Sequence, residues 1–196
     1  MKSVLISIRL EWVEKIASGK KTIEVRKTVP KEVPFKVYIF CTKTKNKWSL
    51  CDYEGAYHNT EGEIVYAQQR IIGEFICDKV FLLRPYTYDG GSADLGYRKF
   101  IRTFEGSSKD NEILSATCLS QDEMFDYIGE GNYGYGWNIS NLKIYDKPKE
   151  LSEFCIPCKV SCENCEKPIF YGCWEEKGKI KVVTRPPQSW QYVEKI

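Results

Sequence analysis

The chain has 196 residues and a mass of 22.8 kDa, enough for one large domain, with or without an appendage, and a substantial core. Its 42% hydrophobic and 29% charged residues exclude the disordered and fibrous classes of protein. The net charge is only +2, which taken alone argues against a strongly basic nucleic-acid binder.

The positive charge is concentrated near the N-terminus. Residues 1–50 hold 12 Lys or Arg and 4 Asp or Glu, residues 51–150 hold 10 and 17, and residues 151–196 hold 7 and 6. The net charges of these segments are therefore +8, −7 and +1. Such asymmetry predicts a cationic surface that meets an anion such as phosphate, although a Lys-rich solvated face accounts for it equally well.

No segment reaches the roughly 18 consecutive apolar residues of a membrane span. Charged residues at Arg9, Glu11 and Glu14 interrupt the first apolar run too early for a signal peptide. We therefore expect a cytoplasmic protein that does not enter a membrane.

The first third of the chain predicts alternating strands and helices. The apolar run 3–8 is typical of a buried strand, and residues 10–18 show helical periodicity that ends at Gly19. Residues 22–26 alternate with period two, with Ile23 and Val25 on the core face. Further strands are expected at 35–42 and 71–77, joined by a hairpin or a loop.

The remainder is more irregular. Residues 86–118 are interpreted as an insertion, and Ser120 to Glu123 form a capping box before a short helix. The glycines between 131 and 136 predict a flexible approach to a strand at 142–145, and residues 180–183 predict a last strand. Several short strands with few helices indicate a mostly-β α+β domain, with a small barrel as the expected architecture.

The densest polar pattern is residues 19–26 (GKKTIEVR). Glu24 and Arg26 lie one pleat apart on one strand face, with Lys21 at the strand entry, so the three groups converge within about 7 Å. Lys21 and Arg26 are suited to clamp a phosphate, while Glu24 accepts from a base amino group or acts as a general base. The alternative is a structural Glu24 cross-pair on a solvated strand face.

The spacing Gly19-x-Lys21-x-x-Glu24-x-Arg26 resembles the GxKxxExR signature of the ASCH domain, a branch of the PUA-like β-barrel superfamily. The resemblance extends to segments 3–18, 72–75 (IGEF), the capped helix from Ser120, 135–139 (YGWNI) and 142–145. Segments 145–151 (YDKPKEL) and 185–190 (RPPQSW) are similar to ASCH proteins of bacteria and their phages.

This resemblance implies an ASCH/PUA-like β-barrel over residues 1–150, with short flanking helices and the insertion at 86–118. Residues 151–196 are expected to form a Cys-rich extension whose final strand packs on the same domain. One bacterial ASCH enzyme deacetylates N4-acetylcytidine with a Lys, a Thr and a Glu, and a ribonuclease activity is attributed to another member. The enzyme's lysine falls on Lys21, but its threonine falls on Glu24, so that activity does not transfer.

Five of the nine cysteines crowd the C-terminal quarter. Tetrahedral zinc needs four thiolates, and this spacing favours a structural site of Cys158, Cys162, Cys165 and Cys173, with Cys155 spare. The alternatives are an iron–sulfur cluster, reduced surface thiols or oxidation-prone cysteine pairs. The remaining cysteines are interpreted as small buried hydrophobes.

Aromatic residues supply further candidates. Trp137 follows a glycine-rich turn near the expected cleft, where it either binds the ligand or packs in the core. The run 97–100 (YRKF) suits stacking on unpaired bases, although such a run more often buries its aromatics. His58, the single histidine, is expected at the surface, which argues against a His-based triad.

The sequence therefore predicts a protein that binds RNA or a nucleotide or nucleoside through a cationic cleft around Lys21, Glu24 and Arg26, with Trp137 beside it. The alternative is a hydrolase of a modified nucleoside or RNA, with Lys21 and Glu24 as its catalytic residues. A third hypothesis is an accessory protein that binds a protein partner through residues 86–118.

Overall fold

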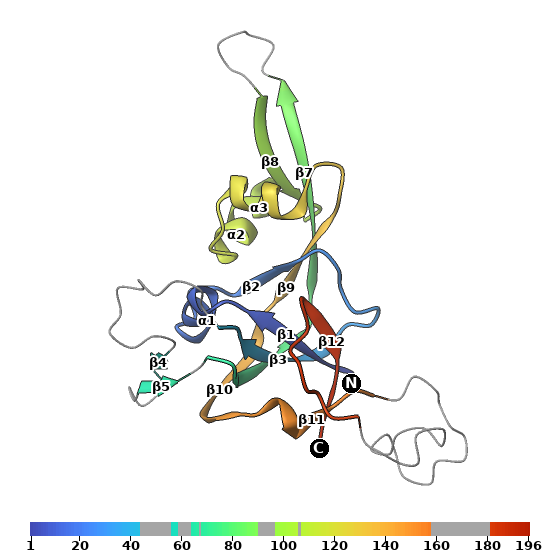
Figure 1. Ribbon diagram of the computed structural model, residues 1–196. Coiled ribbons are helices and arrows are strands. Elements are labelled where there is room, and N and C mark those ends of the chain that lie inside the picture. The colour runs from blue at the N-terminus through green and yellow to red at the C-terminus, as the bar shows by residue number, and fades with distance from the viewer. Residues whose placement is uncertain (44–55, 59–63, 67, 90–96, 106, 158–180) are drawn as a thin grey trace, which may run out of the picture. The chain divides into compact units, whose positions relative to one another are not determined.

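The computed structural model describes residues 1–43, 56–58, 64–66, 68–89, 97–105, 107–157 and 181–196 (Figure 1). The chain forms two compact units. The first comprises Met1–Glu14, Phe35–Phe75 and Leu142–Ile196, and the second comprises Lys15–Pro34 and Ile76–Asn141. The C-terminal segment belongs to the same unit as the N-terminal strand, with which it pairs.

Most strands of the first unit form a five-stranded sheet in the order β10-β6-β3-β1-β12. β1 (Ser3–Ile8) is parallel to β3 (Phe35–Cys41) and antiparallel to β12 (Trp190–Tyr192). β6 (Ile71–Cys77) and β10 (Ser140–Lys149) continue from this unit into the second. The central strands are apolar on both faces, as expected for a parallel pair buried on both sides.

Smaller elements complete the first unit. Between β3 and β6 the sequence left open a hairpin or a loop, and β4 (Ala56–His58) pairs antiparallel with β5 (Ile64–Tyr66) there. The 3-10 helix η1 (Leu151–Glu153) leads into β11 (Phe154–Cys155), which pairs with β13 (Glu194–Lys195). α1 (Leu10–Ala17) begins in this unit.

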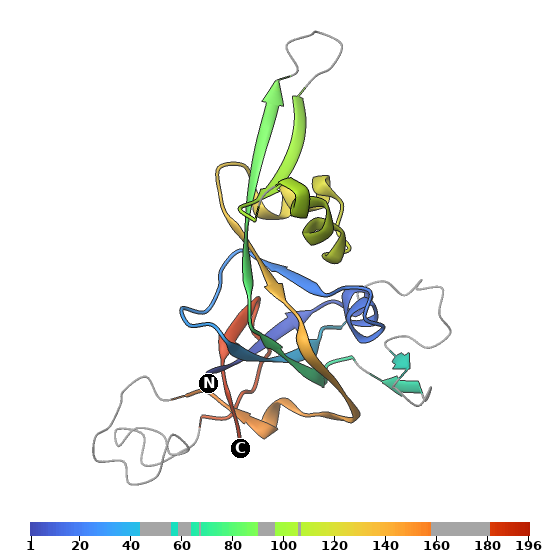
Figure 2. The ribbon, with the colours of Figure 1, turned by 180° about the vertical axis from the view of Figure 1, so that it is seen from behind.

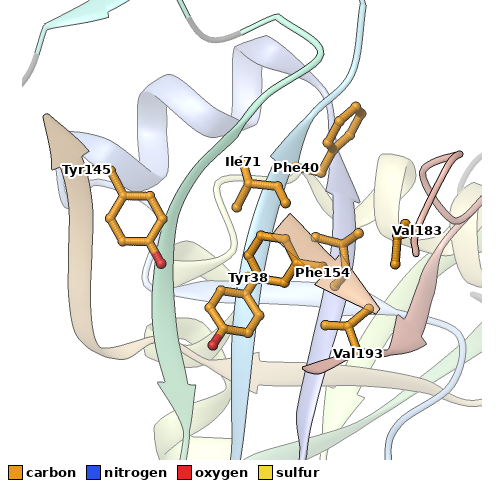
Figure 3. Close-up of a cluster of buried hydrophobic side chains, with 8 residues drawn as sticks. Tyr38, Phe40, Ile71, Tyr145, Phe154, Val183 and Val193 are labelled. Atoms are coloured by element: carbon orange, nitrogen blue, oxygen red, sulfur yellow. The ribbon is translucent and has the colours of Figure 1, made fainter. Parts of the chain in front are cut away.

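One hydrophobic core of the first unit joins residues far apart in sequence (Figure 3). Tyr38 and Phe154 meet edge to face at 4.7 Å between ring centroids. The whole cluster consists of Leu5, Tyr38, Phe40, Ile71, Tyr145, Phe154, Val183 and Val193. The C-terminal segment is thus held by apolar packing as well as by strand pairing.

The second unit is built on a four-stranded sheet in the order β2-β9-β7-β8. Its strands are β2 (Ile23–Arg26), β7 (Val80–Asp89), β8 (Tyr97–Thr103) and β9 (Gly134–Asn138). The helices α2 (Ser107–Ala116) and α3 (Gln121–Ile128) pack on one face. The core between them contains Val25, Leu83, Ile101, Leu114, Met124, Phe125 and Ile128.

The predicted capping box is confirmed. Ser120 Oγ accepts a hydrogen bond from the Glu123 amide at 3.1 Å, and the Glu123 carboxylate accepts one from the Ser120 amide at 2.8 Å. The helix ends at Gly129, whose φ of +89° favours glycine.

Other expectations need correction. No sheet closes into a barrel among the described residues, because alternating residues predict strands but not which strands pair. Of the strand expected at 180–183, the described residues form one isolated bridge, between Val182 and Cys155. The glycine-rich approach is itself strand β9. Of the Cys-rich extension expected at 151–196, residues 158–180 lie outside the described residues.

The expected insertion at 86–118 takes part in regular structure. It contains the second half of β7, all of β8 and α2, and β8 pairs with β7 along seven residue pairs from Leu83 with Thr103 to Asp89 with Tyr97. None of the helices in the described part of the chain has the length and hydropathy needed to cross a membrane.

Candidate functional site

The start of β2 is fixed by how α1 ends. Gly19 adopts a φ of +72°, and its amide donates to the Ile16 carbonyl at 2.9 Å. The Lys21 amide then donates to the Lys15 carbonyl at 2.9 Å, which turns the chain into the strand. Gly19 thus sets the direction in which β2, the strand that carries Glu24 and Arg26, leaves the end of α1.

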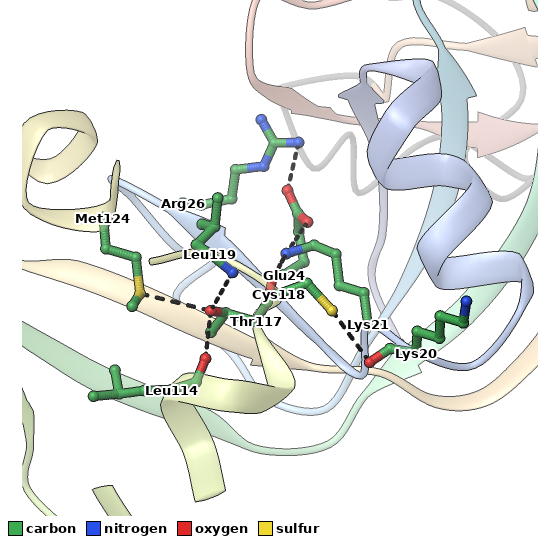
Figure 4. A network of polar contacts seen from close by, with 9 residues as sticks. All are labelled: Lys20, Lys21, Glu24, Arg26, Leu114, Thr117, Cys118, Leu119 and Met124. Atoms are coloured by element: carbon green, nitrogen blue, oxygen red, sulfur yellow. Dashed lines mark hydrogen bonds and ion pairs between the residues drawn. The ribbon is translucent and has the colours of Figure 1, made fainter. Parts of the chain in front are cut away.

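Lys21, Glu24 and Arg26 come together as one ionic cluster (Figure 4). Lys21 Nζ lies 3.4 Å from Glu24 Oε2, and Arg26 NH2 lies 3.0 Å from Glu24 Oε1. Their side chains are 2%, 8% and 9% exposed in that order. The alternative of a solvated cross-pair is therefore wrong, since all three groups are buried.

The connection between α2 and α3 holds the lysine. Lys21 Nζ donates to the Thr117 carbonyl at 2.6 Å, and the Thr22 amide donates to the Ala116 carbonyl at 3.0 Å. The Thr117 hydroxyl donates to the Leu114 carbonyl at 2.6 Å and accepts from the Leu119 amide at 3.2 Å (Figure 4). This fully buried threonine is fixed in place on both sides.

Sequence reasoning missed Thr117. It comes three residues before the helix-capping Ser120, and that spacing is its only local signal. Its approach to Lys21 depends on tertiary packing across 96 residues.

Trp137 lies directly opposite Glu24 in the β2 and β9 pair. Directly opposed residues of an antiparallel pair share a face, so the indole flanks the carboxylate. Trp137 is fully buried. The structure thus joins all four predicted ligand-binding residues, but Trp137 offers no exposed ring for a base to stack on.

The geometry limits what Glu24 does chemically. Each of its oxygens already faces a cation, one from Lys21 and one from Arg26. A general base needs an oxygen directed at the proton that it removes. In this arrangement Glu24 positions the two cations, whereas the cations are the groups suited to meet an anion.

Cys41 and Cys77 are poorly suited to act as nucleophiles. Burial raises the pKa of Cys41 to about 12, with a further increase from Glu14, and burial likewise raises the pKa of Cys77 to about 12. Both thiols stay protonated near neutral pH, in agreement with their interpretation as buried hydrophobes. Cys118 is only half-buried, and its thiol meets the Lys20 carbonyl at 3.3 Å.

The four proposed zinc ligands, Cys158, Cys162, Cys165 and Cys173, lie outside the described residues. Cys155 is described and is buried in β11. Within the described ranges, His, Cys, Asp and Glu side chains form no group of three suited to a metal ion. For His58 the structure gives only its backbone position in β4.

Comparison with known proteins gives matches by structure. The sequence matches no protein-family model and no curated protein. The fold is similar to the crystal structure of the ASCH protein from Zymomonas mobilis, with a TM-score of 0.50 and 15% identity over 98% of this chain and 88% of that one.

Two variants of the same Zymomonas mobilis protein match equally. A tyrosine-to-phenylalanine variant has a TM-score of 0.50 and 15% identity over 99% of this chain and 91% of that one. A serine-to-alanine variant has a TM-score of 0.50 and 14% identity, covering 98% and 89%. At these identities the likeness concerns the fold, which agrees with the motif found at residues 19–26: the chain has the fold of an ASCH domain.

Proposed function

We propose that the protein binds RNA, or a nucleotide or nucleoside, at the cluster of Lys21, Glu24 and Arg26. The observation that carries the proposal is the pairing of two cations with the two oxygens of one carboxylate, at 3.4 Å and 3.0 Å. A guanidinium and an ammonium fixed in this way are arranged to receive phosphate oxygens. The ASCH fold supports the same class of ligand.

Burial of the three charged side chains supports a functional role for the cluster, because burying charges costs folding free energy. Moving charges out of water carries a penalty of several kcal/mol per ion, which a pair of apolar residues would avoid. The two cations and one anion sum to one positive charge, which suits an incoming phosphate. Binding a ligand here requires that the groups covering Arg26 move aside.

The hydrolase alternative has one observation in its favour. Lys21 is nearly buried and is directed at both a carboxylate and the Thr117 carbonyl, so it is positioned firmly. Such a lysine can stabilise a developing negative charge. Turnover of N4-acetylcytidine or of RNA in the same samples would convert the binding proposal into an enzymatic one.

The proposal is tested by measuring RNA and mononucleotide affinity as a function of salt for the wild type and for Arg26→Met. Loss of one charged hydrogen bond weakens binding by about 1.5 to 3 kcal/mol, which is about tenfold or more. The matched control is Lys27→Met, which removes the same charge from the exposed neighbouring residue. It should bind within about twofold of the wild type.

Removing one partner of a buried ion pair can unfold a protein, so thermal melting is recorded for each variant. Arg26→Lys keeps the charge but loses the planar fork, and we expect an intermediate loss of affinity in a folded protein. Folded Arg26 variants that bind RNA and nucleotide as tightly as the wild type would refute the proposal.

A further inference from the structure

The ionic cluster shares a sheet face with a second group of basic and aromatic residues. Glu24 and Arg26 lie on one face of β2, opposite Trp137 and Tyr135 of β9. Tyr135 in turn lies opposite Leu82 of β7. Because side chains alternate along a strand, the same face of β7 continues to Arg84 and Tyr86.

The last strand extends this face. Arg84 lies opposite Arg102 of β8, and Tyr86 lies opposite Phe100. Successive pairs on one face are about 7 Å apart. The surface formed by Arg84, Tyr86, Phe100 and Arg102, called here the ribbon face, therefore begins one pair beyond the row that contains Arg26.

The ribbon face is the one that α2 and α3 leave uncovered. Leu83 of β7 and Ile101 of β8 point the other way, into the core with the helices. Both ribbon views show α2 and α3 on one side of these strands (Figures 1 and 2). Arg84 and Arg102 are exposed, whereas the rings of Tyr86 and Phe100 are half-buried.

The aromatic rings form a platform with the arginines above it. Tyr86 and Phe100 stack at 5.6 Å between centroids with 23° between their planes. The Arg102 guanidinium lies 5.1 Å from the Tyr86 ring, and Arg84 lies 6.0 Å from the ring of Tyr133, which is 47% exposed. Rings beneath guanidinium groups hold them in defined positions at the surface.

Arg84 and Arg102 lie directly opposite each other in the pairing of β7 with β8. Like charges directly opposite in a sheet repel, so this pair destabilises the strands. Lys99, on the helix side of β8, instead pairs with Asp126 at 2.7 Å. Among the described residues, neither Arg84 nor Arg102 forms an ion pair with a carboxylate. The ribbon face thus carries concentrated positive charge beside aromatic rings.

We propose that the ribbon face binds single-stranded nucleic acid that continues from the ionic cluster. The arginines meet backbone phosphates, while Tyr86, Phe100 and Tyr133 offer ring faces and edges to unpaired bases. The inference rests on the proposed function, which assigns the phosphate or nucleoside contact at Arg26. It adds the class of ligand, an unpaired polynucleotide rather than a free nucleotide or a duplex.

The test measures the affinity of an RNA of about twelve unpaired nucleotides, a length within the range bound by small domains. A double variant Arg84→Ala/Arg102→Ala removes the charges, and Tyr86→Leu/Phe100→Leu removes the rings but keeps apolar bulk. We expect each to weaken binding about tenfold or more, since stacking contributes roughly 1 to 3 kcal/mol per base. The arginine variant should also lower the salt slope by about 1.4, the value for two phosphate contacts of a single strand.

Three comparisons make this result specific. Lys99→Ala removes a charge from the helix side of the same strand and should bind like the wild type. Duplex RNA, whose bases are already stacked, should bind more weakly than the single strand. Single-stranded DNA of the same sequence shows whether RNA or DNA is preferred, and tight binding of either one supports the inference.

Two outcomes would overturn it: folded ribbon-face variants that bind the RNA like the wild type, or equal binding of duplex and single strand. Unchanged RNA binding by these variants would indicate that the ribbon face binds a different ligand, such as a protein. Mononucleotide affinity separates the two proposals. Ribbon-face variants should leave it unchanged, whereas Arg26→Met should reduce it, so each proposal can fail alone.

Discussion

At the scale of single residues, Glu24 organises the candidate site. Its two oxygens hold Lys21 and Arg26 at 3.4 Å and 3.0 Å, and this convergence follows from the period-two pattern of the motif. The sequence could not indicate that the cluster is buried, because alternation defines a face but not what covers it. For Trp137 the sequence left open a ligand contact or packing in the core, and its side chain is fully buried.

A second carboxylate, Glu74 in the first unit, gives a test by pH. It accepts a hydrogen bond from the Tyr145 hydroxyl at 2.5 Å and forms an ion pair with Lys36 at 3.0 Å. Burial raises the pKa of Glu74, but these two contacts outweigh burial and lower the pKa below its ordinary value. Its stabilising effect is therefore present above the unfolded-state pKa and is lost as the pH falls through the folded-state pKa.

We predict that acidification from about pH 5 to pH 3, across the ordinary range of a glutamate, lowers the melting temperature of the wild type more than that of Glu74→Gln. Tyr145→Phe removes one of the contacts and should reduce the difference in part. Melting curves across this pH range provide the measurement. Parallel pH profiles for the wild type and Glu74→Gln would show that the carboxylate does not have this role.

At the scale of elements, the sequence predicted β2 and α3 in the unit that holds the site, but not β7, β8, β9 or α2. β1, α1, β2, β3, β6 and the capped helix α3 lie where periodicity and capping residues indicate. β9 was missed because its glycines suggested flexibility. A β-carbon on Gly136 would lie 2.9 Å from Ile23 Cγ2, so a side chain is absent there because the strand packs closely.

Gly73 of β6 gives the sharpest test of such packing. A β-carbon there would lie 2.5 Å from the Lys143 carbonyl oxygen of β10, a backbone atom that cannot rotate away. We expect Gly73→Ala to lower the free energy of unfolding by about 1 to 3 kcal/mol, as measured by urea denaturation.

Gly19 is the matched control, since it has a φ of +72° but open space around the position of a β-carbon. Gly19→Ala should cost about 1 to 2 kcal/mol, and Gly19→Asn should cost less because asparagine tolerates this conformation. At Gly73 the larger asparagine should be worse than alanine. A Gly73→Ala variant as stable as the wild type would contradict the described strand packing.

At the scale of the whole molecule, local patterns were least informative. The parallel pairing of β1 with β3 and the return of β12 to β1 join segments distant in sequence, and neither leaves a local signal. The expected barrel accordingly appears as open sheets in the described ranges. The charge of each segment indicated the site better than the total charge did, since Lys21 and Arg26 both lie in the +8 segment at residues 1–50.

The zinc site in the C-terminal quarter of the chain is a proposal that concerns the stability of the whole molecule. We predict about one equivalent of zinc per purified chain, held by Cys158, Cys162, Cys165 and Cys173, and a lower melting temperature after chelation. Cys165→Ser should lose the metal, whereas Cys118→Ser should retain it. Metal analysis showing well under one equivalent in the wild type would rule the site out.

The central claim, that unpaired RNA contacts the face shared by Arg26 and the ribbon face, is tested most directly by photo-cross-linking. RNA of about twelve nucleotides carrying thiouridine is bound and irradiated, and the cross-linked peptides are identified by mass spectrometry. We predict cross-links at Tyr86, Phe100, Tyr133 and Tyr135. Cross-links confined to α2 and α3, or none above those of an Arg26→Met sample, would contradict it.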